Sequence, residues 1–255
     1  MKNNKKILIA GNWKMNGLKS SSLMITNLMK YIKSRKFKNT DILICPPFTI
    51  AQNFSSISKK SKLMIGAQDC SDKESGAFTG DISPEMLKDI NLEMVILGHS
   101  ERREYHNETS ETVKLKAINA LKNKLNVIIC VGESFSQKKN KKTLRIIGDQ
   151  LKKSLPDNIS SNNLFLAYEP IWAIGSGLVP KNEDILKVHK FISKKLIEKY
   201  GARGKKIKIL YGGSVSKKNA EDILSIEHVN GALIGGASLK YKAVSYTHLT
   251  LPTKA

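Results

Sequence analysis

The sequence predicts a closed barrel of eight parallel β-strands, each followed by a helix: a (β/α)8 barrel of the α/β class. Three observations predict this fold. A short apolar run and a longer amphipathic stretch alternate along the chain. The alternation gives eight strand-like runs in 255 residues, and about 32 residues per unit suits a barrel of roughly 250 residues. No linker or change of composition divides the chain, which favours a single domain.

The eight predicted strands are apolar on both faces, which is typical of parallel strands covered by helices. In chain order they are Ile7–Ala10, Ile42–Cys45, Leu63–Ala67, Met94–Leu97, Val127–Val131, Leu164–Tyr168, Ile207–Tyr211 and Ala232–Ile234.

The stretches between the strands carry apolar residues at helical spacing. Pro84 and Pro180 fit positions near helix starts, and Gly201 fits a position just past a helix end. The apolar positions that define three of the predicted helices are Leu23, Leu28 and Ile32, then Val113, Ala117, Ala120 and Leu121, then Ile185, Val188, Ile192 and Leu196.

A doubly wound open sheet is the rival arrangement. Its usual mark is a Gly-x-Gly-x-x-Gly motif after the first strand, with an acidic residue about 20 positions further on. Here the first strand ends in Gly11-Asn12-Trp13-Lys14, and that motif does not follow. The closed barrel is therefore the favoured interpretation.

Composition limits the classes of protein. Hydrophobic residues make up 40% of the chain and charged residues 25%, which supports a sizeable core and excludes global disorder. The 43 Lys and Arg against 22 Asp and Glu give a net charge of +21, which could serve nucleic acid, a membrane surface or an anionic substrate. The lysines are scattered beside apolar segments rather than concentrated on one element. We therefore expect a lysine-rich solvated surface and no nucleic-acid partner.

Neither export nor membrane insertion is expected. No run of about 18 apolar residues exists. The basic start is followed by only Ile7–Ala10 before Gly11, which is too short for a secretory signal. Cys45, Cys70 and Cys130 form neither a disulfide framework nor a Cys-x-x-Cys metal pair. These features predict a cytoplasmic protein.

Functional residue types follow the predicted strands, at the end of the barrel where active sites of this architecture lie. A carboxylate, an imidazole and a lysine on one rim would make a general-base site with an electrophilic partner. The Gly-rich turns expose backbone N–H groups that can hold a phosphate dianion. In chain order, the strand ends offer Asn12 and Lys14, His99 to Arg103, Cys130 to Glu133, Glu169, Gly212 to Ser214, and Gly235 to Ser238.

These segments resemble the triosephosphate isomerase family, nearly end to end from about Lys5 to Lys240. The resemblance implies a TIM barrel. It also implies an intramolecular aldose–ketose isomerase that interconverts dihydroxyacetone phosphate and D-glyceraldehyde 3-phosphate in glycolysis and gluconeogenesis. Six motifs in family order carry it: Gly11-Asn12-Trp13-Lys14-Met15-Asn16, Gly76-Ala77-Phe78-Thr79-Gly80, Leu97-Gly98-His99-Ser100-Glu101-Arg102-Arg103, Ala167-Tyr168-Glu169-Pro170-Ile171-Trp172-Ala173-Ile174-Gly175, Tyr211-Gly212-Gly213-Ser214-Val215 and Gly235-Gly236-Ala237-Ser238-Leu239.

The resemblance assigns roles residue by residue. Glu169 matches the general base that moves a proton between two carbons. His99 matches a neutral imidazole that polarises the carbonyl, and this family is itself a standard example of such pKa tuning. Lys14 matches the substrate-binding cation, with Asn12 as its hydrogen-bonding neighbour; together they stabilise the enediolate. Glu101 matches the carboxylate that orients Lys14, and a surface ion pair is the alternative.

Pro170 to Pro180 resembles the family's flexible lid, which excludes water and grips the phosphate. Two departures from the family pattern occur there. Ser176 stands where Thr is common, and it keeps the hydroxyl. Leu178-Val179-Pro180 replaces the commoner lysine-containing second hinge, which bears on lid kinetics. The residues that match the phosphate contacts are Gly175, Ser214, Gly235 and Gly236.

The resemblance also implies the partners. Triose phosphates are the expected ligands, with no metal and no cofactor. The Gly76–Gly80 loop resembles one that enters a neighbouring subunit, so a homodimer is expected.

Two rival functions are weaker. Another sugar-phosphate barrel enzyme, such as an epimerase or a phosphoribosyl isomerase, would share the Gly-rich turns but not Lys14, His99 and Glu169 in these contexts. A basic barrel that binds RNA or a surface has only the net charge in its favour.

The C-terminus departs from the family pattern. We expect residues 1–243 to form the isomerase domain and residues 244–255 to be a non-family tail. The tail has poor helix formers, Pro252 near its end and no apolar stripe. It resembles translated adapter read-through, and a divergent native tail is the alternative. The final helix of the barrel is therefore expected to be missing or abnormal.

Overall fold

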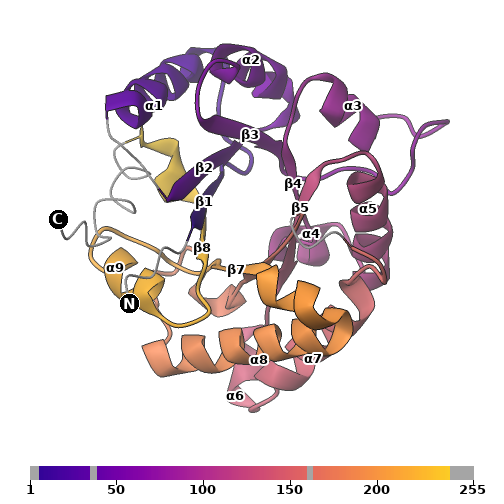
Figure 1. Ribbon diagram of the computed structural model, residues 1–255, viewed down its shortest axis with the longest axis vertical. Helices are drawn as coiled ribbons and strands as arrows, with labels where there is room; N and C mark the ends of the chain where they lie inside the picture. The colour runs from indigo at the N-terminus through magenta and orange to yellow at the C-terminus, as the bar shows by residue number, and fades with distance from the viewer. Residues whose placement is uncertain (1–5, 35–38, 160–162, 242–255) are drawn as a thin grey trace.

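Eight parallel strands surround a central axis in the computed structural model of the chain, and helices cover them on the outside (Figure 1). The structure describes residues 6–34, 39–159 and 163–241. The predicted tail, residues 244–255, lies outside these ranges, as does all of the expected final helix beyond Tyr241.

Each strand pairs in parallel with the next along the chain, and the last closes the barrel by pairing with the first. The predicted (β/α)8 barrel is confirmed, and no predicted strand end is off by more than two residues. The strands are β1 (Ile7–Asn12), β2 (Thr40–Cys45), β3 (Leu63–Ala67), β4 (Met94–Leu97), β5 (Asn126–Val131), β6 (Leu164–Tyr168), β7 (Lys208–Tyr211) and β8 (Gly231–Ile234).

The predicted helices also form. Their bounds are α1 (Ser22–Ser34), α2 (Phe48–Ser58), α3 (Pro84–Asp89), α4 (Ser100–Tyr105), α5 (Ser110–Lys122), α6 (Phe135–Lys139), α7 (Thr143–Ser154), α8 (Asn182–Tyr200) and α9 (Ala220–Ser225). Short 3-10 helices are η1 (Lys19–Ser21), η2 (Ile171–Ala173), η3 (Gly201–Lys206) and η4 (Gly236–Leu239).

Local sequence explains several helix ends. Ser83 caps α3 by accepting a hydrogen bond from the Met86 N–H, and Pro84 occupies the first turn, where its missing N–H costs nothing. Gly201 ends α8 with φ of 59°, a left-handed conformation that glycine adopts readily. Leu23 lies in α1 as predicted but is 67% exposed, and the buried face of the helix consists of Ile25, Leu28 and Ile32.

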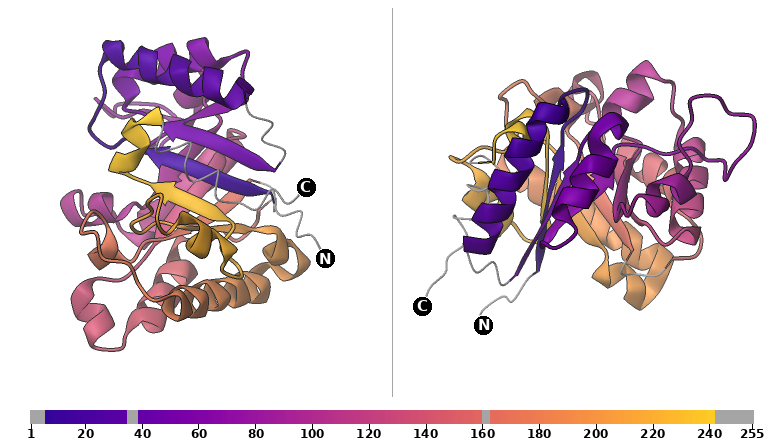
Figure 2. Two further views of the ribbon diagram at one scale, coloured as in Figure 1. Left: turned by 90° about the vertical axis from the view of Figure 1, so that its left-hand side faces the viewer. Right: turned by 90° about the horizontal axis from the view of Figure 1, so that it is seen from above.

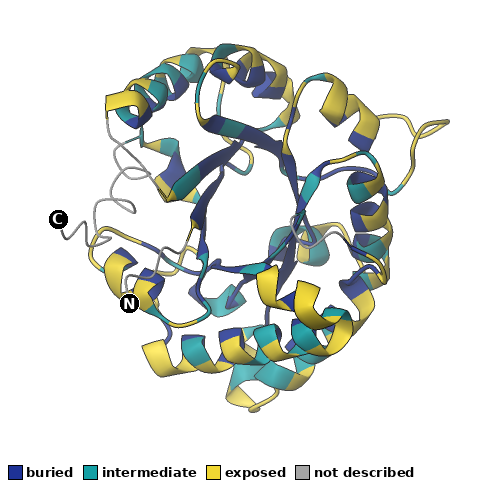
Figure 3. Cartoon of the chain, viewed as in Figure 1, coloured by how far each residue is buried: buried dark blue, intermediate teal, exposed yellow. Residues whose placement is uncertain are grey.

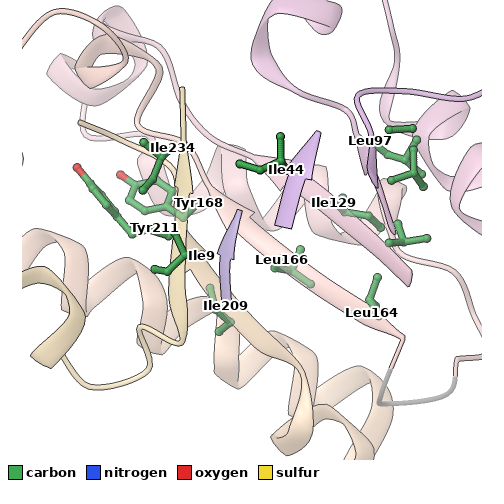
Figure 4. Packing of buried hydrophobic residues seen from close by; sticks show 14 of the residues in the cluster. Ile9, Ile44, Leu97, Ile129, Leu164, Leu166, Tyr168, Ile209, Tyr211 and Ile234 are labelled. Atoms are coloured by element: carbon green, nitrogen blue, oxygen red, sulfur yellow. The ribbon is translucent and has the colours of Figure 1, made fainter. Parts of the chain in front are cut away.

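The strands alternate between two apolar clusters because successive side chains point to opposite faces of a sheet. One cluster contains only strand residues, such as Leu8, Ile96 and Leu210, and fills the inside of the barrel. The other joins the outer strand faces to the helices; Figure 4 shows part of it, including Ile9 and Leu166. Figure 3 shows that the strands are buried and that the outer faces of the helices are exposed.

Within the described ranges, no helix is both long enough and apolar enough to cross a lipid bilayer.

Candidate active site

A cavity of about 260 Å³ lies where the C-terminal ends of the strands meet. Glu101 stands beside the lining rather than in it, and contacts the cavity through Lys14. The structure brings the other predicted site residues together around this one space: Asn12, Lys14, His99, Glu169, Gly175, Ser214, Gly235 and Gly236.

Lys14 is held in a strained conformation. Its φ of 54° lies in the left-handed region, which is costly for a residue with a Cβ. Its N–H donates to Asn12 Oδ1 at 3.0 Å, and its carbonyl accepts from Gln68 Nε2 at 2.9 Å. The same Gln68 amide donates to the Cys45 carbonyl at 2.9 Å. The Lys14 ammonium donates to Glu101 Oε1 at 2.5 Å, which fixes the cation beside the cavity.

His99 caps the N-terminus of α4. Its Nδ1 accepts a hydrogen bond from the Glu101 N–H at 3.2 Å. A neutral ring with Nδ1 as acceptor carries its proton on Nε2, and this bond assigns that tautomer. Nε2 faces Glu169 Oε1 at 3.0 Å, so the proton points toward the cavity-lining carboxylate.

Glu169 directly follows β6 and is only 2% exposed. Its N–H donates to the Val131 carbonyl at 2.8 Å, which continues the β5–β6 pairing by one residue. Its Oε2 accepts from the Ser100 N–H at 3.0 Å. The Glu169 carboxylate therefore has hydrogen-bond partners at the N-terminus of α4, beside the His99 imidazole. Burial raises the pKa of the neighbouring Cys130 thiol well above its usual range, which suits a packing role.

A buried charge network lies under the turn that presents His99. Lys116 Nζ donates to both carboxylate oxygens of Asp69 at 2.9 Å and also bonds Glu108. Burial opposes the charge on Lys116, but these two carboxylates outweigh it and raise the lysine pKa. Glu108 Oε2 then accepts from the Gly98 N–H at 3.1 Å, so the network holds the residue next to His99.

Sequence reasoning missed the residues that support the site. Lys116 lies on the same helical stripe as Val113, Ala117 and Ala120. A lysine on a buried apolar stripe indicates a buried acidic partner, so the sequence did contain a signal for this network. Gln68 directly follows β3, and the polar residue at the end of that strand is a comparable signal. Asp69 and Glu108 have no motif of their own, because only the fold brings them to Lys116.

The lid segment joins the site to β7. Ser214 Oγ donates to the Ala173 carbonyl at 2.5 Å, and Trp172 Nε1 donates to Glu133 Oε1 at 3.0 Å. The Ser176 hydroxyl donates a hydrogen bond to the Trp172 carbonyl at 3.0 Å. Beyond these contacts, residues 175–179 are exposed. Gly175, with φ of 68°, takes a conformation that favours glycine.

Fold and cavity together define a class: a (β/α)8-barrel enzyme that places a carboxylate, an imidazole and a lysine beside Gly-rich turns. Within the described ranges, no group of three or more His, Cys, Asp or Glu is placed to hold a metal ion.

Comparisons with known proteins agree with this class. The family model described as triosephosphate isomerase matches residues 7–249. Triosephosphate isomerases from Rhizobium meliloti and Granulibacter bethesdensis are each 46% identical over 233 residues, 91% of this chain and 91% and 94% of theirs. A crystal structure of triosephosphate isomerase from Bartonella henselae superposes with a TM-score of 0.88 at 39% identity, covering 95% of this chain and 97% of that one. The chain belongs to the triosephosphate isomerase family.

Proposed function

We propose that this cavity interconverts dihydroxyacetone phosphate and D-glyceraldehyde 3-phosphate, with Glu169 as the base and His99 as the electrophile. The reaction itself follows from membership of the family: the chain is an intramolecular aldose–ketose isomerase of glycolysis and gluconeogenesis. The residue roles are the proposal. The observation that carries them is the 3.0 Å contact between Glu169 Oε1 and His99 Nε2 inside the cavity.

In the proposed reaction, Glu169 removes a proton from the carbon next to the carbonyl and returns it to the neighbouring carbon. In the observed conformation its carboxylate faces Ser100 and His99, so it turns toward the substrate when the substrate binds. That movement frees the Nε2–H of His99 to donate to the carbonyl oxygen. A neutral donor can give and recover this proton as the enediolate forms and collapses.

For the phosphate end of the substrate, Lys14 supplies a positive charge and the Gly-rich turns supply backbone N–H groups. The Lys14 ammonium lies on the cavity wall, and a Cβ at Gly235 would come within 3.4 Å of Lys14 Cε. A side chain there would occupy the space beside the cation, which glycine leaves free for a phosphate oxygen. Gly175 and Gly236 have no atom within 4 Å of a Cβ position, so their backbones are open to a ligand.

We also propose that the chain works as a homodimer through the Gly76–Gly80 loop. Residues 73–80 are exposed and project from the barrel between β3 and α3 (Figure 2). Large apolar side chains are exposed on the loop and elsewhere: Phe78 is 44% exposed, Met86 57% and Met15, next to Lys14, 97%. Burying them against a second copy would remove apolar surface from water.

Two further expectations are kept as proposals. We propose a cytoplasmic location, because all three cysteines are buried and free of disulfide bonds, as is usual in a reducing compartment. The isomerase domain is proposed to comprise residues 1–243, although the family match runs to residue 249.

A groove of about 640 Å³ lies between α1 and η4. The buried Trp13 Nε1 lines this groove and has no hydrogen-bond partner in the described part of the chain. A family-like closing helix would cover this groove.

The test of the residue roles is a coupled isomerase assay on Glu169→Gln. The amide keeps the shape but cannot take the proton, so we expect kcat to fall by roughly 10²- to 10⁴-fold while inorganic phosphate still binds. Glu198→Gln, an exposed position on α8, is the matched control and should keep wild-type activity. A Glu169→Gln enzyme with more than a tenth of wild-type kcat would remove Glu169 from the base role. Turnover of ribulose 5-phosphate would favour the rival barrel enzyme.

A further inference from the structure

The indole of Trp172, in the first hinge of the lid, is held from two directions. Its Nε1 donates to Glu133 Oε1 at 3.0 Å. The Lys138 ammonium lies 3.6 Å from the centroid of its ring. A cation this close to an aromatic face is attracted by the negative face of the ring. The edge and the face of one side chain are thus fixed at the same time.

Both holding residues belong to one short segment after β5. Glu133 is buried, with 1% exposure, and α6 begins two residues after it. A capping box between Ser134 and Gln137 fixes the start of α6, and Lys138 lies in its last turn, where the helix dipole favours a cation. Burial raises the pKa of Glu133, and the charge of Lys138 is among the groups that oppose this rise.

Lys138 also reaches the element that follows the second hinge of the lid. Its Nζ is 3.8 Å from Asp184 Oδ2, in the first turn of α8. This ion pair is long and partly exposed, so it orients the lysine rather than adding much stability. One ammonium therefore contacts residues on both sides of the lid's tip, Trp172 before it and Asp184 after it.

The lid conformation that this contact stabilises is the resting one. Trp172 lies three residues after Glu169, whose carboxylate accepts from the Ser100 N–H and faces the His99 ring. A lid that closes on the substrate draws the first hinge along with it, because the two are continuous chain. The indole would then move relative to α6, and the cation–π contact would be lost.

We propose that Lys138 is a positioning residue, which stacks on Trp172 and holds the lid in its resting conformation. The proposal rests on the function proposed above. Lys138 thereby sets the balance between the resting lid and the lid that grips phosphate. The apparent affinity of a ligand is reduced by the fraction of protein in the binding-competent state, so a contact made only at rest weakens ligand binding.

The test compares Lys138→Gln with two other variants. Lys138→Arg keeps a cation that stacks on aromatic rings. Lys139→Gln makes the same change of charge at the next residue, which is exposed. The readouts are the Kd for inorganic phosphate, followed through Trp172 fluorescence, and KM and kcat for dihydroxyacetone phosphate. The only other tryptophan, Trp13, is buried.

We expect Lys138→Gln to lower the phosphate Kd and the KM by about two- to fivefold, the equivalent of one partly exposed cation–π contact. Lys138→Arg and Lys139→Gln should match wild type. Unchanged or weaker phosphate binding in Lys138→Gln would overturn the proposal, as would equal tightening in Lys139→Gln. An inactive wild-type chain would instead refute the proposed function, and the phosphate Kd would still report on the hinge.

Discussion

Gly132 lies where the end of β5 passes the backbone of Glu169, and it offers a direct way to displace the proposed base. A Cβ built on Gly132 would lie 1.7 Å from the Glu169 carbonyl oxygen. Gly132 is also fixed from the other side, because the Gln150 side chain accepts from its N–H at 2.8 Å and donates to its carbonyl at 2.9 Å. The two Gln150 hydrogen bonds therefore oppose movement of the Gly132 backbone away from Glu169.

The geometry sets the size of the effect. In Gly132→Ala the gap must widen from 1.7 Å to at least 3.0 Å, the closest approach that real Cβ atoms show. Glu169 therefore shifts by about 1 Å or both Gln150 hydrogen bonds break. A displacement of about 1 Å at a catalytic group costs on the order of 100-fold in rate. Overpacking of this kind also costs about 1–3 kcal/mol of stability.

The assay measures kcat for dihydroxyacetone phosphate on protein whose folding is verified by circular dichroism. Gly148→Ala is the matched control: the nearest atom to its added Cβ is on Phe191 at 3.4 Å, an ordinary contact, and the site is inside α7. Alanine there should raise stability by about 0.5–1 kcal/mol and leave kcat unchanged. A folded Gly132→Ala enzyme with kcat within tenfold of wild type would refute the reasoning.

Two further predictions concern the proposed dimer and the tail. Charged residues at Phe78 and Thr79 should dissociate the dimer and lower activity together, whereas Leu115→Asp on α5 should do neither; sizing chromatography that shows an intact, active dimer would argue against the loop. Replacing the chain from Val244 onward by a family-like amphipathic helix should raise the thermal unfolding midpoint, because about four buried apolar side chains contribute roughly 6–12 kcal/mol before entropy. Equal midpoints in the two proteins would contradict that proposal.

The fold could be predicted closely because parallel strands have a strong signature. Strands buried on both faces are continuous apolar runs, and Leu63–Ala67 and Met94–Leu97 have the same bounds in the sequence pattern and in the structure. The differences arise where polar residues extend a strand. Asn12 and Thr40 belong to β1 and β2 through backbone pairing that hydropathy does not report.

The site could be predicted in part, because strand ends gather at one face of a barrel. Asn12 ends β1, and His99 and Glu169 follow β4 and β6, yet all three line one cavity. The supporting residues could not be found in the same way. Gln68 holds the strained Lys14 through a contact 54 positions away in sequence, and no periodicity encodes a hydrogen bond between two loops.

The departure from the family motif at Leu178-Val179-Pro180, in the second hinge of the lid, could be interpreted only with the structure. Leu178 and Val179 are 54% and 41% exposed, while Pro180 is buried and α8 begins at Asn182. Proline fixes its own φ and restricts the residue before it. Gly177, with φ of 76°, and Leu178 lie next to this restricted stretch of backbone. The first hinge, by contrast, is held by side-chain contacts at Trp172. The two ends of the lid are thus restrained by different means, backbone stiffness at one and side-chain contacts at the other, and only the contacts can be released by a single side-chain substitution without altering the backbone.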